Sequence, residues 1–301
     1  MTGPASDLPT RRSIGTTRIG PLDVTWGERT LVMGILNATP DSFSGDGLLA
    51  GPDDAVSAAV ATGRQMVADG ADLLDVGGES TRPGHAPVDA AEERRRVVPV
   101  VAALRAALPG TPISIDTTKP EVAEAALAAG ASLVNDVWGV GPDEDLVRIA
   151  AAHRVPLVVM HNRAEPRYDD LVAEVVADLR AALDRAVRLG VARDRLIVDP
   201  GFGFGKTPEQ NLALVRELGA LRVLGRPILL GTSRKSTLGR VLDLPVDERL
   251  EATIATTALG IAAGADIVRV HDVRANVRAA RVADAIIRGT WRSDAAEGGS
   301  S

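Results

Sequence analysis

Short apolar runs recur along the chain, and each ends at a polar or glycine residue. The runs and their end residues are Leu31–Leu36 with Asn37, Ala71–Leu74 with Asp75, Ile113–Ile115 with Asp116, Ser132–Val134 with Asn135, Pro156–Met160 with His161, Leu196–Val198 with Asp199, Pro227–Leu230 with Gly231, and Asp266–Val268 with Arg269. They show no alternation of polar and apolar positions. Such runs are typical of strands buried on both faces of a parallel sheet.

Stretches with the helical spacing of apolar residues lie after these runs. The stretches are Asp53–Asp69, Asp89–Leu108, Pro120–Ala129, Pro142–Ala152, Asp169–Leu189, Pro208–Leu218, Asp247–Ala263 and Val273–Arg288. Several begin with Pro or Asp, which the first turn of a helix favours, and several are followed by glycine. Repeated strand–helix units over about 260 residues predict an α/β fold, a single (β/α)8 TIM barrel.

The carboxyl ends of the strands in such a barrel meet at one mouth. The polar residues that end the runs are therefore expected to surround one shared pocket. Two long segments, Thr39–Pro52 and Gly77–Val88, follow the first two strands and contain Gly and Pro. Long loops of this kind are usually functional in a compact barrel, so we expect mobile loops over the pocket.

The chain of 301 residues is expected to hold one barrel domain, residues 16–291, between disordered tails at 1–15 and 292–301. The first residues lack the apolar core of a signal peptide, and no run approaches the ~20 apolar residues of a membrane span. We therefore expect a cytoplasmic protein with no membrane partner.

Composition narrows the possible partners and chemistry. The 34 basic and 40 acidic residues give a net charge of -6, which argues against a nucleic-acid partner. The absence of cysteine excludes disulfides, thiolate metal ligands and a cysteine nucleophile. The histidines show no zinc-type spacing, so a protein zinc site is not expected.

Lysine is rare in this chain. Lys119, Lys206 and Lys235 each follow a predicted strand, and arginine supplies nearly all other positive charge. Lysine retained in this position suggests a need for a compact ammonium group, because arginine and lysine bind differently. Lys119 alone is better interpreted as the solvated start of a helix.

Phenylalanine is placed just as selectively. Phe43, Phe202 and Phe204 all lie in segments after the first and sixth strands. Rings at the mouth of a barrel suggest contact with a flat ligand, since aromatic pairs add about 0.5–1.5 kcal/mol beyond burial. Packing of the loop on itself remains an equal alternative for Phe202.

Glycine-rich polar segments follow four of the strands. They are Asn37-Ala-Thr-Pro-Asp41-Ser-Phe43-Ser-Gly-Asp46-Gly, Asp75-Val-Gly-Gly-Glu79-Ser-Thr81-Arg82-Pro83-Gly84, Asp199-Pro-Gly-Phe202-Gly-Phe204-Gly-Lys206 and Gly231-Thr-Ser-Arg234-Lys235-Ser236. Each is weak alone, because glycine-rich loops have many structural explanations. In Arg269-Val-His271, alternate side chains at a strand end point the same way, towards the usual phosphate region of this barrel.

Together these segments resemble the dihydropteroate synthase family over about residues 30–290. The most specific matches are Met33-Gly-Ile-Leu-Asn-Ala-Thr-Pro-Asp-Ser-Phe-Ser and Gly77-Gly-Glu-Ser-Thr-Arg-Pro-Gly. The resemblance implies a transferase of folate biosynthesis. It would join (7,8-dihydropterin-6-yl)methyl diphosphate to 4-aminobenzoate and release diphosphate, with Mg2+ as cofactor and a homodimer as the assembly.

The resemblance also implies roles for individual residues. The pterin would contact Asp116, Asn135, Met160, Asp199, Gly203, Phe204 and Lys235. The diphosphate would contact Asn37, Arg269 and His271, with Mg2+ shared between Asn37 and the diphosphate oxygens. The 4-aminobenzoate would contact Phe43, Thr81, Arg82, Pro83, Gly84, Phe204 and Ser236. The catalytic residues would be Asp46, Lys235 and Arg269.

One departure from the family pattern affects these assignments. The family loop usually reads Ser-Asp-Gly-Gly, whereas this chain has Ser44-Gly-Asp46-Gly, so the acid is displaced by one position. A non-catalytic pterin-binding homologue therefore remains an alternative. A methyltetrahydrofolate–corrinoid methyltransferase-like barrel is a second alternative. It would share the pterin pocket but need no diphosphate site, and Arg269-Val-His271 counts against it.

Overall fold

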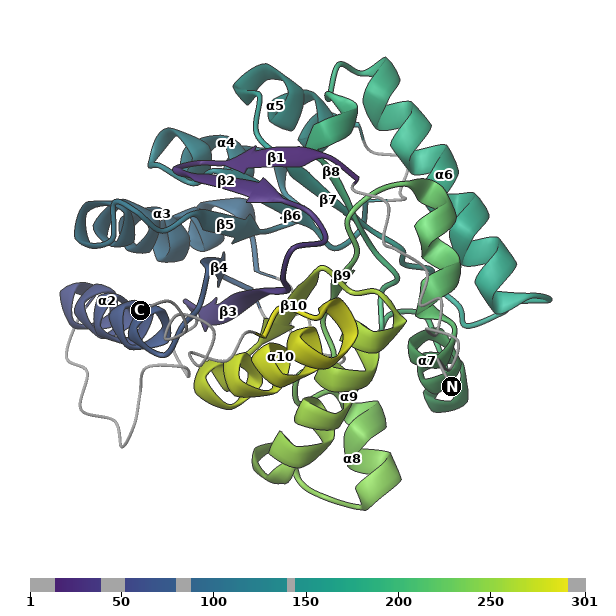
Figure 1. Ribbon diagram of the computed structural model, residues 1–301. Coiled ribbons are helices and arrows are strands. Elements are labelled where there is room, and N and C mark those ends of the chain that lie inside the picture. The colour runs from purple at the N-terminus through teal and green to yellow at the C-terminus, as the bar shows by residue number, and fades with distance from the viewer. Residues whose placement is uncertain (1–13, 39–51, 80–87, 140–143, 292–301) are drawn as a thin grey trace, which may run out of the picture.

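The computed structural model describes residues 14–38, 52–79, 88–139 and 144–291. In this part of the chain, eight strands form a parallel sheet in the order β8-β7-β6-β5-β4-β3-β10-β9, with helices around it (Figure 1). A parallel bridge between Val198 of β8 and Ile228, next to β9, links the two ends of the sheet. The predicted (β/α)8 barrel is confirmed.

The barrel strands are β3 (Leu31–Asn37), β4 (Leu73–Gly77), β5 (Ile113–Asp116), β6 (Leu133–Asp136), β7 (Leu157–Met160), β8 (Leu196–Asp199), β9 (Leu229–Leu230) and β10 (Ile267–Val270). The helices are α2 (Pro52–Ala68), α3 (Ala90–Ala107), α4 (Pro120–Ala128), α5 (Asp145–His153), α6 (Leu171–Arg188), α7 (Pro208–Arg216), α8 (Ser236–Leu242), α9 (Leu250–Ala263) and α10 (Val273–Arg288). Short 3-10 helices are η1 (Arg193–Arg195), η2 (Leu218–Leu224) and η3 (Val246–Glu248). None of these helices is long and apolar enough to cross a membrane.

Local sequence explains where several helices begin and end. At α7, the Thr207 side chain accepts from the Gln210 backbone and the Gln210 side chain accepts from the Thr207 backbone, which forms a capping box. At the end of α9, Gly264 has φ 119°, a left-handed conformation that favours glycine. These ends match the proline and glycine positions in the sequence.

An antiparallel hairpin, β1 (Thr16–Ile19) and β2 (Leu22–Thr25), precedes the barrel and was not predicted. Figure 1 shows it lying across one end of the ring of strands. Its apolar side chains form one cluster with residues at the amino ends of the barrel strands: Leu31, Met33, Leu73, Leu133, Val158, Ile197, Leu229 and Ile267. The hairpin therefore closes the floor of the barrel. Its strands alternate between exposed and buried residues, so they lack the continuous apolar runs that identified the barrel strands.

Some predicted boundaries differ from the structure. The run Pro227–Leu230 contains only the two-residue strand β9, and the predicted helix Asp247–Ala263 divides into η3 and α9. The short helix α8 was not predicted. Residues 1–13, 39–51, 80–87, 140–143 and 292–301 lie outside the described residues, so the predicted tails and the greater part of both long loops fall there.

Candidate active site at the carboxyl ends of the strands

The interior of the barrel changes from apolar to polar along the strands. On β4, Leu73 belongs to the apolar floor cluster, and Asp75 lies two residues further along the strand. On β10, Ile267 belongs to the same cluster, and Arg269 lies two residues further. Residues two apart on a strand point to the same side, so these polar side chains also face the interior. They form its upper layer.

Arg269 lies at the centre of this polar layer, between two carboxylates. Its Nε donates to Asp75 Oδ2 at 2.5 Å and its Nη2 donates to Asp116 Oδ2 at 2.6 Å. Burial alone would lower the pKa of Arg269, but the two carboxylates outweigh it and raise that pKa. The guanidinium is therefore a permanent cation held across β4, β5 and β10.

For Asp116, burial has a larger effect on the pKa than the neighbouring charges, the reverse of the case at Arg269. Burial raises the pKa of Asp116 from 3.8 to about 7; Arg269 opposes this rise and Asp75 adds to it. Two buried carboxylates that share one guanidinium leave a surplus of negative charge. A cationic or N–H-rich ligand edge next to Asp116 would offset that surplus.

Asp75 belongs to the site, although no ligand was predicted for it from the sequence. It is fully buried, and its Oδ2 accepts from Arg269 and, at 3.0 Å, from Asn135 Nδ2. It thus joins a residue predicted for the diphosphate to one predicted for the pterin. Its Oδ1 has no hydrogen-bond partner among the described residues. The available signal was its position at the end of the second apolar run.

Lys235 and Asp199 lie on the other side of the same layer. Burial lowers the pKa of Lys235 to about 8, which nearby Asp199 and Asp116 partly offset. Burial likewise raises the pKa of Asp199, and Lys235 and Arg269 oppose that rise. Each of these groups acts on the others through space. The structure therefore brings the predicted carboxylates, lysine and arginine together at one mouth.

The aromatic residues after β8 divide between the core and the mouth. The ring of Phe204 lies 4.5 Å from Lys235 Nζ and is partly exposed. Phe202 has no exposed surface and packs in the main apolar core, although its backbone oxygen accepts from Lys235 Nζ. Ring contact with a ligand was therefore the wrong alternative for Phe202, because its side chain points into the core.

The predicted diphosphate residues lie on the neighbouring strands β3 and β10 or, for His271, directly after β10. These strands pair in parallel, with Arg269 opposite Met33, so Asn37 and His271 both lie at the carboxyl end of this pair. His271 Nδ1 lies 3.0 Å from Ser233 Oγ, which also accepts from the His271 backbone N–H at 3.1 Å. A serine thus fixes the imidazole at the mouth.

A second partly buried lysine, Lys206, follows β8. Its Nζ contacts His161 Nδ1 at 3.0 Å, Gly201 O at 3.1 Å and Phe204 O at 2.9 Å. Burial lowers the pKa of Lys206 to about 7, with Asp199 opposing. Lys206 follows a predicted strand, but its place in the sequence predicted no role for it.

Lys119 is not the solvated helix start that we expected. It precedes α4, and its Nζ pairs with Glu79 and, at 2.5 Å, with the buried Glu93 of α3. Glu79 Oε1 also accepts from Val88 N at 3.2 Å. Lys119 therefore stabilises the end of β4 against α3, a contact between distant segments that the sequence does not reveal.

Several predicted site residues are not described. Phe43, Asp46, Thr81, Arg82, Pro83 and Gly84 lie outside the described residues. Ser236 is the exposed first residue of α8. Met160 and Asp199 are register partners on β7 and β8, and Gly203 lies between the two phenylalanines. No group of three or more His, Cys, Asp and Glu side chains able to hold a metal occurs within the described ranges.

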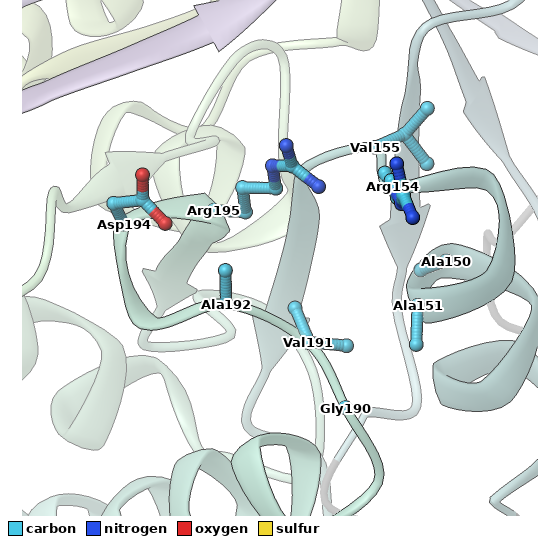
Figure 2. Close-up of a pocket in the computed structure, with 9 residues that line it drawn as sticks. All are labelled: Ala150, Ala151, Arg154, Val155, Gly190, Val191, Ala192, Asp194 and Arg195. Carbon is cyan, nitrogen blue, oxygen red and sulfur yellow. The ribbon is translucent and has the colours of Figure 1, made fainter.

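A separate cavity of about 370 Å³ lies at the opposite end of the barrel. It is lined by residues that precede β7 and β8, including Arg154, Val155 and Arg195 (Figure 2). The charged mouth residues are absent from its lining. This cavity therefore lies away from the candidate active site.

Comparison with known proteins agrees with this geometry. Residues 33–271 match the family model described as pterin binding enzyme. The chain is 49% identical over 272 residues to the dihydropteroate synthase of Clostridium beijerinckii, covering 90% of this chain and 99% of that protein.

Solved structures give the same result. The dihydropteroate synthase of Clostridium difficile, crystallised in the presence of pteroic acid, has 48% sequence identity and a TM-score of 0.83, covering 87% of this chain and 98% of that one. The Xanthomonas albilineans enzyme in complex with 7,8-dihydropteroate has 43% identity and a TM-score of 0.80, covering 88% and 95%.

Proposed function

Because the chain belongs to the dihydropteroate synthase family of folate-biosynthesis transferases, we propose that the polar layer at its barrel mouth carries out the reaction of that family. The reaction joins (7,8-dihydropterin-6-yl)methyl diphosphate to 4-aminobenzoate. The products are 7,8-dihydropteroate, diphosphate and a proton. The observation that carries the proposal is the Arg269 guanidinium held between Asp75 and Asp116, beside Asp199 and Lys235.

The pterin is proposed to lie across β5, β6 and β8. Its amino-pyrimidine edge presents N–H donors. Asp116 and Asp199 would accept hydrogen bonds from these donors, and Asn135 would bind the rest of the edge. Burial favours the neutral form of both acids, and pairing with these donors would offset the cost of desolvating their carboxylates. Lys235 would donate to the carbonyl and N5 side of the pterin, with Met160, Gly203 and Phe204 against its faces.

The diphosphate is proposed to lie over β3 and β10, against Asn37, Arg269 and His271. Arg269 has an outer Nη2 that now pairs with Asp116 and an inner Nε that pairs with Asp75. When the pterin edge occupies Asp116, Nη2 would become available to a phosphate oxygen. Asp75 would continue to anchor the guanidinium through Nε. Pterin and diphosphate recognition are thereby linked through one arginine.

The chemistry proposed is ionisation of the C–O bond between the pterin methylene and the diphosphate. The bonding pair leaves with the diphosphate, and the methylene cation is delocalised into the pterin ring. The nitrogen of 4-aminobenzoate then forms the new C–N bond and loses a proton. Arg269 and Lys235 would stabilise the charge that develops on the leaving group and ring, an electrostatic rather than nucleophilic task.

The donor set suits Mg2+ that arrives with its substrate. Magnesium prefers oxygen ligands and usually binds through one or two protein groups plus substrate phosphates. Asn37 supplies an amide oxygen at the carboxyl end of β3, and the described residues contain no group of three or more His, Cys, Asp and Glu side chains able to hold a metal by themselves. Bound there with Asn37, Mg2+ would neutralise diphosphate charge.

The remaining roles are predictions on residues outside the description or at its edge. Asp46, Phe43 and residues 81–84 are proposed to cover the cation and form the 4-aminobenzoate pocket together with Phe204. Ser236 is proposed to bind the carboxylate of that substrate. A cytoplasmic location and the domain limits 16–291 also stay predictions.

A homodimer through the late helices is proposed from the exposed apolar surface. Leu259 on α9 and Val282 and Ile286 on α10 are 62%, 61% and 70% exposed. The two helices lie side by side (Figure 1). Val282 and Ile286 are four residues apart and so lie on the same face of α10. Exposed apolar residues that lie together commonly mark protein interfaces. Sedimentation of Ile286→Glu tests this, with Val223→Glu, at a residue of η2 that is 63% exposed, as control. A dimer in both variants would contradict the proposed interface.

The activity test is direct. We expect dihydropteroate and diphosphate in equal amounts when the protein, both substrates and Mg2+ are combined, and neither product when 4-aminobenzoate is omitted. Asp199→Asn should reduce turnover strongly, whereas Asp184→Asn, at an exposed residue of α6, should not. A folded protein that binds the pterin but releases no diphosphate would support the non-catalytic alternative.

A further inference from the structure

The ammonium of Lys206 ties two neighbouring segments of the mouth together. Lys206 lies at the end of the segment between β8 and α7, and His161 directly follows β7. The Lys206 Nζ donates to Gly201 O, Phe204 O and His161 Nδ1 at 3.1, 2.9 and 3.0 Å, and its longest contact is with His161 O at 3.5 Å. An ammonium has three N–H donors, so these contacts engage all of them.

The segment that Lys206 holds has a backbone that only glycine permits. Gly201, Gly203 and Gly205 have φ of 71°, 85° and 54°. A Cβ on Gly201 would lie 1.8 Å from His161 O, and one on Gly205 would lie 2.2 Å from Arg163 O. The segment therefore lies directly on the chain that follows β7, and side chains cannot wedge between the two.

This same segment positions the groups proposed to bind the pterin. Gly201 N donates to Asp199 Oδ1 at 2.7 Å, and Phe204 N donates to Gly201 O at 3.1 Å, closing a turn. Phe202 O accepts from Lys235, and the Phe204 ring lies 4.5 Å from Lys235 Nζ. A shift of the turn would therefore move the pterin-facing ring and alter the contacts of both Asp199 and Lys235.

His161 transmits the anchoring to α6. Because its Nδ1 accepts from Lys206, the ring proton lies on Nε2, which donates to Asp178 Oδ2 at 3.2 Å. Arg163 Nη2 donates to the same Asp178 oxygen at 2.7 Å. Burial, with the charge of Lys206 adding to it, lowers the pKa of His161 to about 4 and keeps the ring neutral. The chain of contacts thus ends on a helix rather than in solvent.

We propose that Lys206 is a positioning residue for the pterin: it holds the Gly201–Phe204 turn against the end of β7, so that Asp199, Lys235 and Phe204 keep the geometry that the substrate needs. The inference rests on the proposed function. It adds a residue that does not itself contact the substrate and acts through the turn.

Steady-state kinetics test the proposal with three variants. Lys206→Met keeps the length of the side chain and removes every donor, and its KM for the pterin diphosphate should rise roughly tenfold or more, with kcat less affected. Lys206→Gln keeps two donors and should show a smaller rise. Arg216→Met removes an exposed cation on α7 and should keep the wild-type KM. A wild-type KM in Lys206→Met would overturn the proposal.

Two measurements that need no catalysis separate this inference from the proposed function. Loss of the Lys206 charge should raise the pKa of His161, measured by NMR titration, and should speed hydrogen exchange of the Phe204 amide. Both changes in a protein without synthase activity would support the positioning role while contradicting the proposed function. If neither change occurs in a folded and active Lys206→Met or Lys206→Gln protein, the positioning role alone is contradicted.

Discussion

The two ends of the barrel interior are built on the same strands and differ completely in chemistry. At the amino end, Trp26 directly follows the hairpin and belongs to one apolar cluster with Met33 and Leu73, and all three are almost fully buried. At the carboxyl end, the same inward-facing rows continue as Asp75 and Arg269. The floor gains stability from apolar burial, whereas the mouth places charges where their desolvation costs free energy. Stability and chemistry are thus separated by about two residues along each strand.

The largest effect is expected at the mouth. Lys235→Met should lower kcat/KM by about a hundredfold to a thousandfold, because one electrostatic group of the site is lost. Its stability should be unchanged or higher, since burial disfavours the ammonium and lowers its pKa to about 8. Steady-state assays and thermal unfolding of the same preparation check both values. A parallel loss of activity and stability would mean that the two ends are not separate.

A substitution at the floor of the barrel is expected to lower stability and leave activity unchanged. Trp26→Ala should lower the free energy of unfolding by about 3–5 kcal/mol, the usual cost of emptying a large buried aromatic site. It also removes the bond from Trp26 Nε1 to Thr17 Oγ1 at 2.7 Å. Urea unfolding measures the loss, and kcat/KM of the folded fraction should stay near wild type. Trp291→Ala, at a residue 72% exposed, is the matched control and should change neither.

The pH dependence of stability should reveal the buried acid at the mouth. Burial raises the pKa of Asp116 from 3.8 to about 7, so between these values the folded state holds a proton that the unfolded chain releases. The contribution of Asp116 to the free energy of unfolding therefore falls as pH rises from about 4 to about 7. Urea unfolding of wild type and Asp116→Asn at several pH values measures both free energies of unfolding. The wild-type value minus the variant value should fall as pH rises over this range.

The buried histidine His161 does not obscure that comparison. The pKa of His161 is lowered to about 4, so its own contribution rises with pH over part of the same range. It is present in both proteins and cancels in the difference. A difference that stays constant with pH would show that Asp116 remains ionised against Arg269 throughout.

The smallest effect is expected at the boundary between the two layers. Ser114 lies opposite Asp75 on the next strand, and its buried hydroxyl has no hydrogen-bond partner within the described residues. Ser114→Ala should therefore leave the free energy of unfolding unchanged or raise it by up to about 1 kcal/mol. Thr257→Val should lower it, because the Thr257 hydroxyl donates to Asn276 Oδ1 at 2.7 Å. Chemical denaturation of both variants checks the contrast.

Much of the fold was predictable because the barrel repeats one pattern. Each apolar run is continuous, which marks a strand buried on both faces, and the prolines and glycines mark the helix ends. The floor hairpin was missed because its strands alternate between exposed and buried residues and contain no such run. Phe202 was ambiguous for another reason: an aromatic residue in a glycine-rich segment can point to the core or the mouth, and only the turn decides between them.

The residues of the site were easier to predict from the sequence than the pairs that their side chains form. The polar ends of the runs identified Asp116, Asn135 and Asp199, and the structure brings them to one mouth. The pairing of Asp75 with Arg269 joins residues 194 positions apart, and the pairing of Lys119 with Glu93 joins residues 26 apart. No local pattern encodes such distances.

The alternation of parallel strands with helices, and the polar side chains that follow the strands, could be predicted from local sequence because hydrophobic periodicity and helix-end preferences are local properties. The folded chain was needed to show which carboxylates share Arg269, which glycines let the segment after β8 lie against the chain that follows β7, and which lysine anchors that segment. Those choices depend on closure of the barrel, which sets strands from distant parts of the chain side by side.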